Sequence, residues 1–157
     1  MNDINIKLKE QTGGWFNVVI VTLDELIVCP AILTNDNASR VVLAPAASGL
    51  DILPVGENIK ITEVPQKTKS GFLYSIKGDF EIAYQSKELD TYFKSYLNKK
   101  VALVGIKHTG QQKLYGSKKF PLDFSYQFIN GTKYEDGIKI RVTVSGKIPQ
   151  KPVFIYD

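Results

Sequence analysis

The amino-acid sequence predicts a mainly β protein, a β-barrel or β-sandwich with one amphipathic α-helix packed on the sheet. Two patterns favour this class. Apolar and polar residues alternate along most of the chain, which is the period of a half-buried strand, and only one segment has the 3.6-residue spacing of a helix. The chain has 157 residues, of which 43% are hydrophobic and 23% charged. We therefore expect residues 1–157 to form a single domain.

The N-terminal half is expected to contain short strands joined by turns. Runs rich in β-branched or alternating apolar residues predict strands at 15–21, 26–29, 40–43 and 59–64, and either one long strand or two short strands at 72–84. The first two of these runs are separated by a short turn, so we expect them to pair as a hairpin. Gly78 lies within the last run and indicates a bulge.

Residues 44–58 are predicted to form a long loop that carries a small apolar island. Loops in compact domains usually have about 4–6 residues, and longer ones tend to be functional or disordered. The island consists of Leu50, Ile52 and Leu53. It would suit contact with a neighbouring subunit, and packing beneath its own domain is the alternative.

Residues 86–98 are predicted to form the helix. Ser86 is a suitable N-cap, and Glu88 and Asp90 place negative charge in the first turn. Apolar side chains then recur at helical spacing, at Leu89, Tyr92, Phe93, Tyr96 and Leu97. This stripe is expected to lie on the sheet as part of the core.

The C-terminal third has the clearest strand patterns. A buried strand is predicted at 101–106, and strict alternation at 120–128 and 138–144 predicts two antiparallel strands with one apolar and one polar face. Residues 145–157 are expected to form a C-terminal arm. Its strand at Val153, Phe154, Ile155 and Tyr156 is a candidate for contact between subunits through its exposed edge.

The sequence offers no catalytic, metal-binding or cofactor-binding motif, so we expect a protein that is not an enzyme and needs no cofactor. Cys29 and His108 are its sole cysteine and histidine, which excludes zinc sites with several cysteines and argues against Ser-His-Asp chemistry. The longest apolar stretch, 26–33, is broken by Pro30 and is far shorter than the ~20 residues of a membrane-spanning helix. Residues 1–8 lack the features of a signal peptide, so we expect no membrane partner and a cytoplasmic location.

Charge is distributed unevenly along the chain. Residues 1–90 carry a net charge of −4 and residues 91–157 a net charge of +8. Residues 91–122 contain no acid but seven lysines, namely Lys94, Lys99, Lys100, Lys107, Lys113, Lys118 and Lys119. Such a segment could meet phosphate or an acidic partner. Solvation of ordinary surface positions is the alternative, since the chain has 18 Lys and only two Arg.

Two functional hypotheses follow from these patterns. In the first, the protein is a subunit that joins copies of itself into a ring or tube by extending a sheet from one copy into the next. In the second, it is a β-barrel that binds single-stranded nucleic acid by stacking and electrostatics. Most phenylalanines occupy alternate, core-facing positions, which leaves few of them for a stacking platform.

A resemblance to a known group supports the first hypothesis. Residues 101–126 contain the motifs Leu-Tyr-Gly-Ser and Pro-Leu-Asp-Phe, residues 137–146 end in Val-Ser-Gly, and residues 149–156 close the pattern. This order of strands and turns resembles structural proteins of the tail or neck in tailed phages and prophages of Bacteroidetes-type hosts. The resemblance covers the C-terminal third of the chain and includes no catalytic signature.

The resemblance implies a small β-barrel virion component that assembles as a homo-oligomeric ring or tube with other virion structural proteins. It further implies a location in the host cytoplasm during assembly and in the virion afterwards. A subunit of this kind could line a passage for DNA. The residues we expect to face that DNA are Lys107, Lys113, Lys118 and Lys119.

Overall fold

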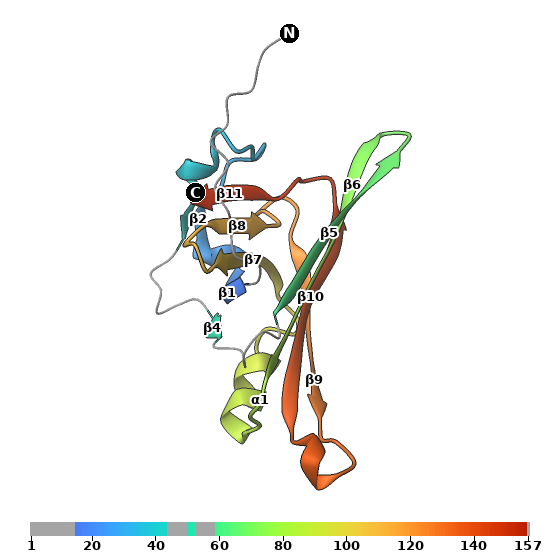
Figure 1. Ribbon diagram of the computed structural model, residues 1–157. Helices are drawn as coiled ribbons and strands as arrows, with labels where there is room; N and C mark the ends of the chain where they lie inside the picture. The colour runs from blue at the N-terminus through green and yellow to red at the C-terminus, as the bar shows by residue number, and fades with distance from the viewer. Residues whose placement is uncertain (1–14, 44–49, 53–58, 157) are drawn as a thin grey trace.

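The computed structural model describes residues 15–43, 50–52 and 59–156 (Figure 1). It is mainly β, as predicted, with a curled antiparallel sheet that forms a half-barrel and one α-helix. The strands are β1 (Trp15–Thr22), β2 (Leu26–Val28), β3 (Val42–Leu43), β4 (Leu50–Ile52), β5 (Lys60–Thr68), β6 (Gly71–Ile82), β7 (Lys100–Lys107), β8 (Gln112–Tyr115), β9 (Leu122–Ile129), β10 (Lys139–Ile148) and β11 (Val153–Tyr156). The helices are α1 (Lys87–Lys94) and the short 3-10 turns η1 (Leu23–Glu25), η2 (Ala38–Arg40) and η3 (Tyr134–Asp136).

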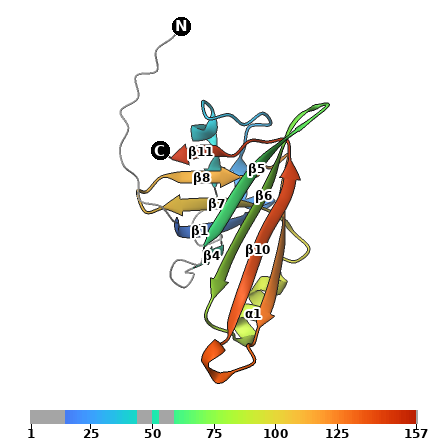
Figure 2. The same cartoon turned by 45° about the vertical axis from the view of Figure 1, so that its right-hand side comes forward.

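The main sheet branches at β7 into two wings. The long wing has the order β9-β10-β6-β5, and the short wing has the order β4-β1-β7-β8-β11. They are joined where Lys100 and Val101 of β7 pair with Asp123 and Leu122 of β9. Figures 1 and 2 show the strands of the long wing running steeply across those of the short wing. We call the face of the long wing that is turned toward the short wing its inner face.

The main core lies between the two wings. Its largest fully buried side chains come from both wings and from α1, namely Ile20, Ile76, Phe80, Phe93, Leu103, Leu122 and Ile140. The alternation of β9 and β10 places apolar residues inward and polar residues outward, as predicted. These two strands pair antiparallel, which confirms the expected hairpin, although β10 continues to Ile148.

A second core covers the other face of the short wing. Residues 23–43 cross this face and bury Leu26, Leu33 and Ala38 against Val104 and Leu114. The short wing is therefore buried on both faces, which explains the nearly continuous apolar run at 101–106.

Helix α1 is capped and packed as its sequence predicts, but it is shorter than 86–98. The Ser86 hydroxyl accepts a hydrogen bond from the Leu89 amide at 3.1 Å. The Phe93 ring is fully buried and lies 5.6 Å from the ring of Tyr126, centroid to centroid. The helix ends at Lys94, and residues 95–98 continue as turns.

Two local predictions for the N-terminal half are wrong. The strand at 15–21 does not form a hairpin with 26–29, because β1 pairs with β7 and β4 while β2 pairs with β3. Gly78 does not mark a bulge, because β6 keeps regular register with both neighbours there. The glycine instead allows close packing between the wings, since a Cβ at this position would lie 2.8 Å from Leu103 Cδ2.

Part of the predicted loop at 44–58 is a strand. β4 pairs antiparallel with β1, with Ile52 opposite Val18 and Leu50 opposite Ile20. Leu53 and the remaining residues of that segment lie outside the described residues. Within the described part of the chain, no helix is long and apolar enough to cross a membrane.

Gly105 provides a test of how tightly the wings pack. A Cβ on this residue would lie 2.6 Å from Trp15 Cζ3 and 3.1 Å from Ile61 Cδ1. We expect Gly105→Ala to lower the free energy of unfolding by about 1–3 kcal/mol, because the added methyl group overpacks the core. Denaturant unfolding measures this loss. The control Ser125→Thr adds a methyl group at an exposed strand position and should change stability by less than about 0.5 kcal/mol; equal effects would contradict the packing described here.

Candidate functional site

The long wing extends beyond the short wing as a projecting hairpin. Toward the tip of the hairpin, the pairing of β6 with β10 ends at Tyr74, which lies opposite Ile148. Beyond it, residues 66–68 and 71–73 pair only with each other. We call residues 66–73 the arm. Figures 1 and 2 show it standing clear of the body of the protein.

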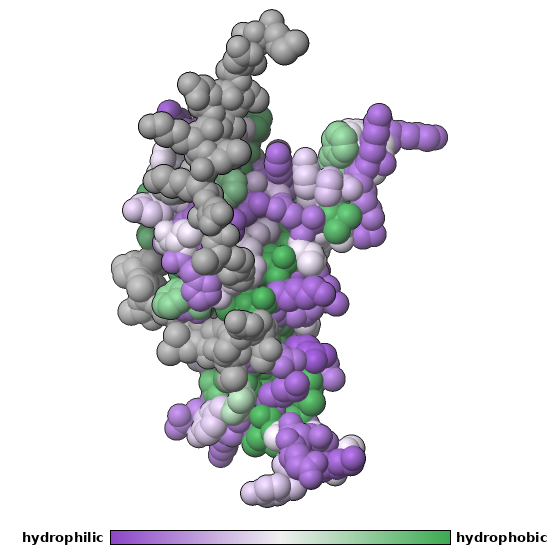
Figure 3. All heavy atoms as spheres, in the orientation of Figure 1, coloured by the Kyte–Doolittle hydropathy of each residue, from purple (hydrophilic) through white to green (hydrophobic). Residues whose placement is uncertain are grey.

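The arm and its base carry apolar side chains on both faces. Phe72 is 54% exposed and shares the inner face with Tyr74, while Val64 is 53% exposed on the outer face. Figure 3 shows apolar side chains among the charged side chains of the arm and its base. Strands that are apolar on both faces are normally buried on both, and a two-stranded hairpin alone is marginally stable in water.

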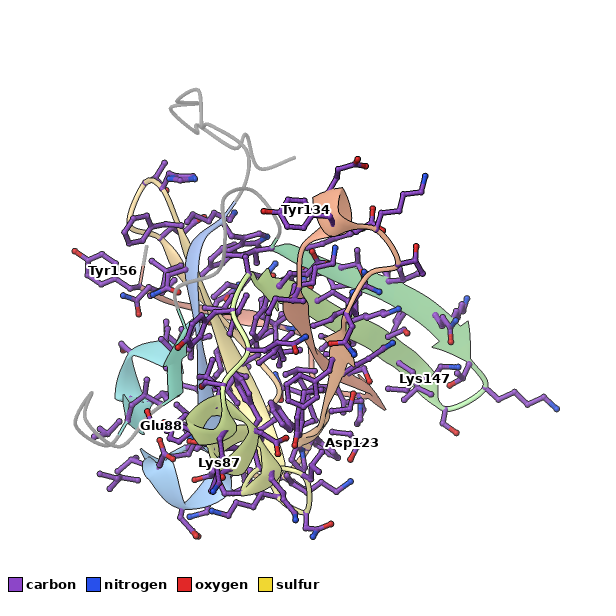
Figure 4. The ribbon with its side chains drawn as sticks, turned by 90° about the horizontal axis from the view of Figure 1, so that it is seen from below. Lys87, Glu88, Asp123, Tyr134, Lys147 and Tyr156 are labelled. Atoms are coloured by element: carbon purple, nitrogen blue, oxygen red, sulfur yellow. The ribbon has the colours of Figure 1, made fainter. Side chains whose placement is uncertain are left out.

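The opposite end of the long wing also exposes its inner face. Phe128 is 37% exposed and Ile138, two positions before the buried Ile140, is 49% exposed. Tyr134 in η3 is fully exposed, and Figure 4 shows it at the turn between β9 and β10. We call residues 128–138 the turn end.

Hydrogen bonds hold the turn end in one conformation. The Asp136 carboxylate accepts bonds from the amides of Thr132 at 3.0 Å and Lys133 at 2.9 Å. These two bonds are the main reason that the pKa of Asp136 is lowered. At the base of the turn, Gln85 Nε2 donates to the carbonyl oxygens of Ile129 and Lys139.

The structure brings together two of the four lysines predicted to face DNA. Lys107 Nζ lies 5.7 Å and Lys113 Nζ 5.0 Å from the centroid of the Phe154 ring. Lys113 also forms an ion pair with Glu63 of β5, with 15% of its side chain exposed. This pair links the two wings across the open side of the half-barrel, so the charge of Lys113 is neutralised within the chain.

Lys118 and Lys119 lie elsewhere, in the turn between β8 and β9. Both are exposed, and Lys119 Nζ lies 5.6 Å from the centroid of the Phe120 ring. The turn is fixed by Ser117, whose amide donates to the Phe120 carbonyl oxygen and whose hydroxyl accepts from the Phe120 amide. The four predicted lysines therefore do not form one cluster.

The C-terminal strand β11 lies at the edge of the short wing but is well integrated into the chain. Val153 is buried in the second core, and Phe154 and Ile155 are half-buried. The Phe154 amide donates to Asn35 Oδ1 at 3.0 Å, which occupies one donor on the outer edge of the strand. Tyr156 is 64% exposed.

The outer face of the long wing carries paired charges. Glu81 accepts from Arg141 and forms a second ion pair with Lys139 at 3.0 Å. The hydrogen bond from Arg141 lowers the pKa of Glu81 more than burial raises it. Asp79 accepts from Thr143 at 2.7 Å. Among the described residues, no group of three or more His, Cys, Asp or Glu is placed to hold a metal ion.

The arm and the turn end were not identified from the sequence. The alternation at 120–128 assigned Phe128 to the core, and residues 65–71 fell between the strands predicted at 59–64 and 72–84. A signal was present in the lengths of the strands. β6 has 12 residues and β10 has 10, whereas the strands of the short wing have at most eight.

Comparisons with known proteins do not assign a function. No protein-family model, curated protein or solved structure gives a significant match to this chain. Function is therefore inferred from the geometry of the chain itself.

A double-mutant cycle tests the ion pair between Glu63 and Lys113. We expect Glu63→Gln and Lys113→Met to show a coupling energy of about 0.5–2 kcal/mol in denaturant unfolding, because the pair is partly desolvated. The control cycle uses the pair Lys100 and Asp123, whose side chains are 57% and 69% exposed. Its coupling should be about 0–1 kcal/mol and should fall with added salt. If the coupling energy of Glu63 with Lys113 is weaker than that of the control pair, the ion pair between Glu63 and Lys113 does not stabilise the contact between the wings.

Proposed function

We propose that this protein is a structural subunit that joins copies of itself into a ring or tube and transforms no substrate. The observation that supports this most directly is the arm, a hairpin that projects from the body and exposes Phe72 on its inner face, with Val64 exposed on the outer face at its base. Exposed apolar surface of this kind marks interaction sites. A neighbouring copy would bury Phe72 and Val64 and would supply the packing that an isolated hairpin lacks.

The free edge of β5 adds a second means of contact. Within the described residues β5 pairs with β6 alone, and Pro65 lies inside it without a register shift. Proline has no amide hydrogen, so it fits into a paired strand where its nitrogen points away from the neighbouring strand. The nitrogen of Pro65 therefore points away from β6. The alternation of antiparallel pairs then turns the amides of Ile61, Glu63 and Lys67 outward as well. No other strand among the described residues pairs with this edge, so these amides are available to an added strand.

The resemblance of the C-terminal third to tail or neck proteins of tailed phages is in keeping with this role. We accordingly propose a virion component that assembles in the host cytoplasm with other virion proteins. The candidate contacts at Leu50, Ile52 and Leu53 and at Val153–Tyr156 remain part of this proposal, with Tyr156 as the most exposed described member. The arm is the contact that the geometry favours over them.

The single-stranded nucleic-acid hypothesis has weaker support. Lys113 is paired with Glu63, and the rings of Trp15 and Phe154 have lysine ammonium groups over them. These rings are therefore less available for stacking on bases. Passage of DNA past Lys107, Lys118 and Lys119 within an assembled ring remains a hypothesis.

A matched pair of variants tests the proposed function. Native mass spectrometry of the wild-type protein should show multiples of the 17.6 kDa chain. We expect Phe72→Ser to weaken assembly about 5- to 150-fold, because a truncated apolar anchor at an interface costs roughly 1–3 kcal/mol.

The control is Phe16→Ser, which removes an aromatic ring of similar exposure, 63%, from the short wing. It should assemble like the wild type. A wild-type protein that stays monomeric at high concentration would contradict the proposal. Equal assembly of Phe72→Ser and wild type would show that the arm is not the contact.

A further inference from the structure

We infer that the arm of one copy docks on the turn end of the next copy, so that copies join head to tail along the long wing. This inference rests on the proposed function, and it specifies which two surfaces of the chain meet. Figure 1 shows the arm and the turn between β9 and β10 at opposite ends of the same four strands. When the contact is made once between two copies and is not repeated in reverse between them, it is heterologous, and it generates rings or open stacks instead of closed dimers.

Both surfaces are continuations of one apolar face. Phe72 lies on β6 four residues before Ile76, which is buried on the inner face of the long wing. At the other end, Phe128 is paired with Ile140, which is buried on the same face. Among the described residues, the short wing and α1 cover the middle of this face, while Phe72 at one end and Phe128 at the other are exposed. Docking would bury Phe72 against Phe128 and Ile138, and so extend one core into the next.

Charge favours this contact over contact between two like ends. The arm carries Lys67 and Lys69 and no acid. The turn end carries Glu135 and Asp136 with one lysine, Lys133. Two arms placed together would repel each other, as would two turn ends, whereas an arm on a turn end brings opposite charges together.

The turn end is suited to receive a partner because it is already ordered. The Asp136 carboxylate fixes the turn through the Thr132 and Lys133 amides, and Gly131 has a φ of +69° that glycine adopts without strain. A Cβ at Gly131 would lie 2.7 Å from Asp136 Cβ, so the turn is tightly packed as well. A rigid surface loses little conformational entropy when the arm binds.

Crosslinking between two single-cysteine chains tests the inference. Both chains carry Cys29→Ser to remove the native thiol. One chain carries Ser70→Cys at the tip of the arm and the other carries Tyr134→Cys at the turn end; both positions are exposed. The two chains are mixed and treated with a short bismaleimide. The control mixture replaces Tyr134→Cys with Ser125→Cys, which is exposed on the outer face of the long wing.

We expect the crosslinked pair to form at least fivefold more in the first mixture than in the control mixture. Equal yields from an assembled protein would overturn the inference and leave the proposed function standing. A second measurement uses Ile138→Ser, which should weaken assembly as Phe72→Ser does. If Phe72→Ser weakens assembly and Ile138→Ser leaves it unchanged, the arm docks elsewhere. A wild-type protein that remains monomeric would overturn both the inference and the proposed function.

Discussion

The incomplete cover of the long wing by the short wing is the constraint on which the rest of this structure depends. The strands of the long wing reach 12 residues and run steeply across those of the short wing, so the short wing covers only their middle part. The apolar alternation of β6, β9 and β10 continues past the covered region, so inner-face side chains appear at the surface at both ends. These side chains are buried only when another molecule binds over them, and their burial then favours association. A second copy of the chain presents complementary surfaces.

Close approach of the wings explains the residues at their junction. Gly78 of the long wing has no side chain because Leu103 of the short wing occupies the space beside it, and a Cβ on Gly105 would meet Trp15 of its own wing and Ile61 of the long wing. On the open side, Glu63 and Lys113 join β5 to β8 with an ion pair that is partly shielded from water. The two wings are thus joined by strand pairing between β7 and β9 and, toward β5, by close packing and the ion pair between Glu63 and Lys113. Lys113 consequently stabilises the fold through its ion pair with Glu63, whereas Lys118 and Lys119 are exposed at the surface.

Sequence periodicity predicted the strands better than their partners. Alternation located β9 and β10, and the spacing of Ser86, Leu89 and Phe93 located α1, because those patterns depend on local geometry. The pairing of β1 with β7, some 80 positions away, has no local signature, so a hairpin with the neighbouring run was predicted instead. The arm was missed for a related reason. The alternation around an apolar residue such as Phe72 is the same whether its face of the sheet is covered or exposed. How far the short wing covers the long wing is known only from the assembled fold.

Hydrogen exchange of the arm amides tests the central claim most directly, because it reports whether another molecule covers this hairpin. The account predicts that residues 66–73 exchange rapidly in dilute protein and become protected as concentration rises. Residues 128–138 should gain protection in parallel, while the ribbon of β2 and β3 should not change. Exchange in the arm that is independent of protein concentration, in a protein that remains a single chain throughout, would contradict the account.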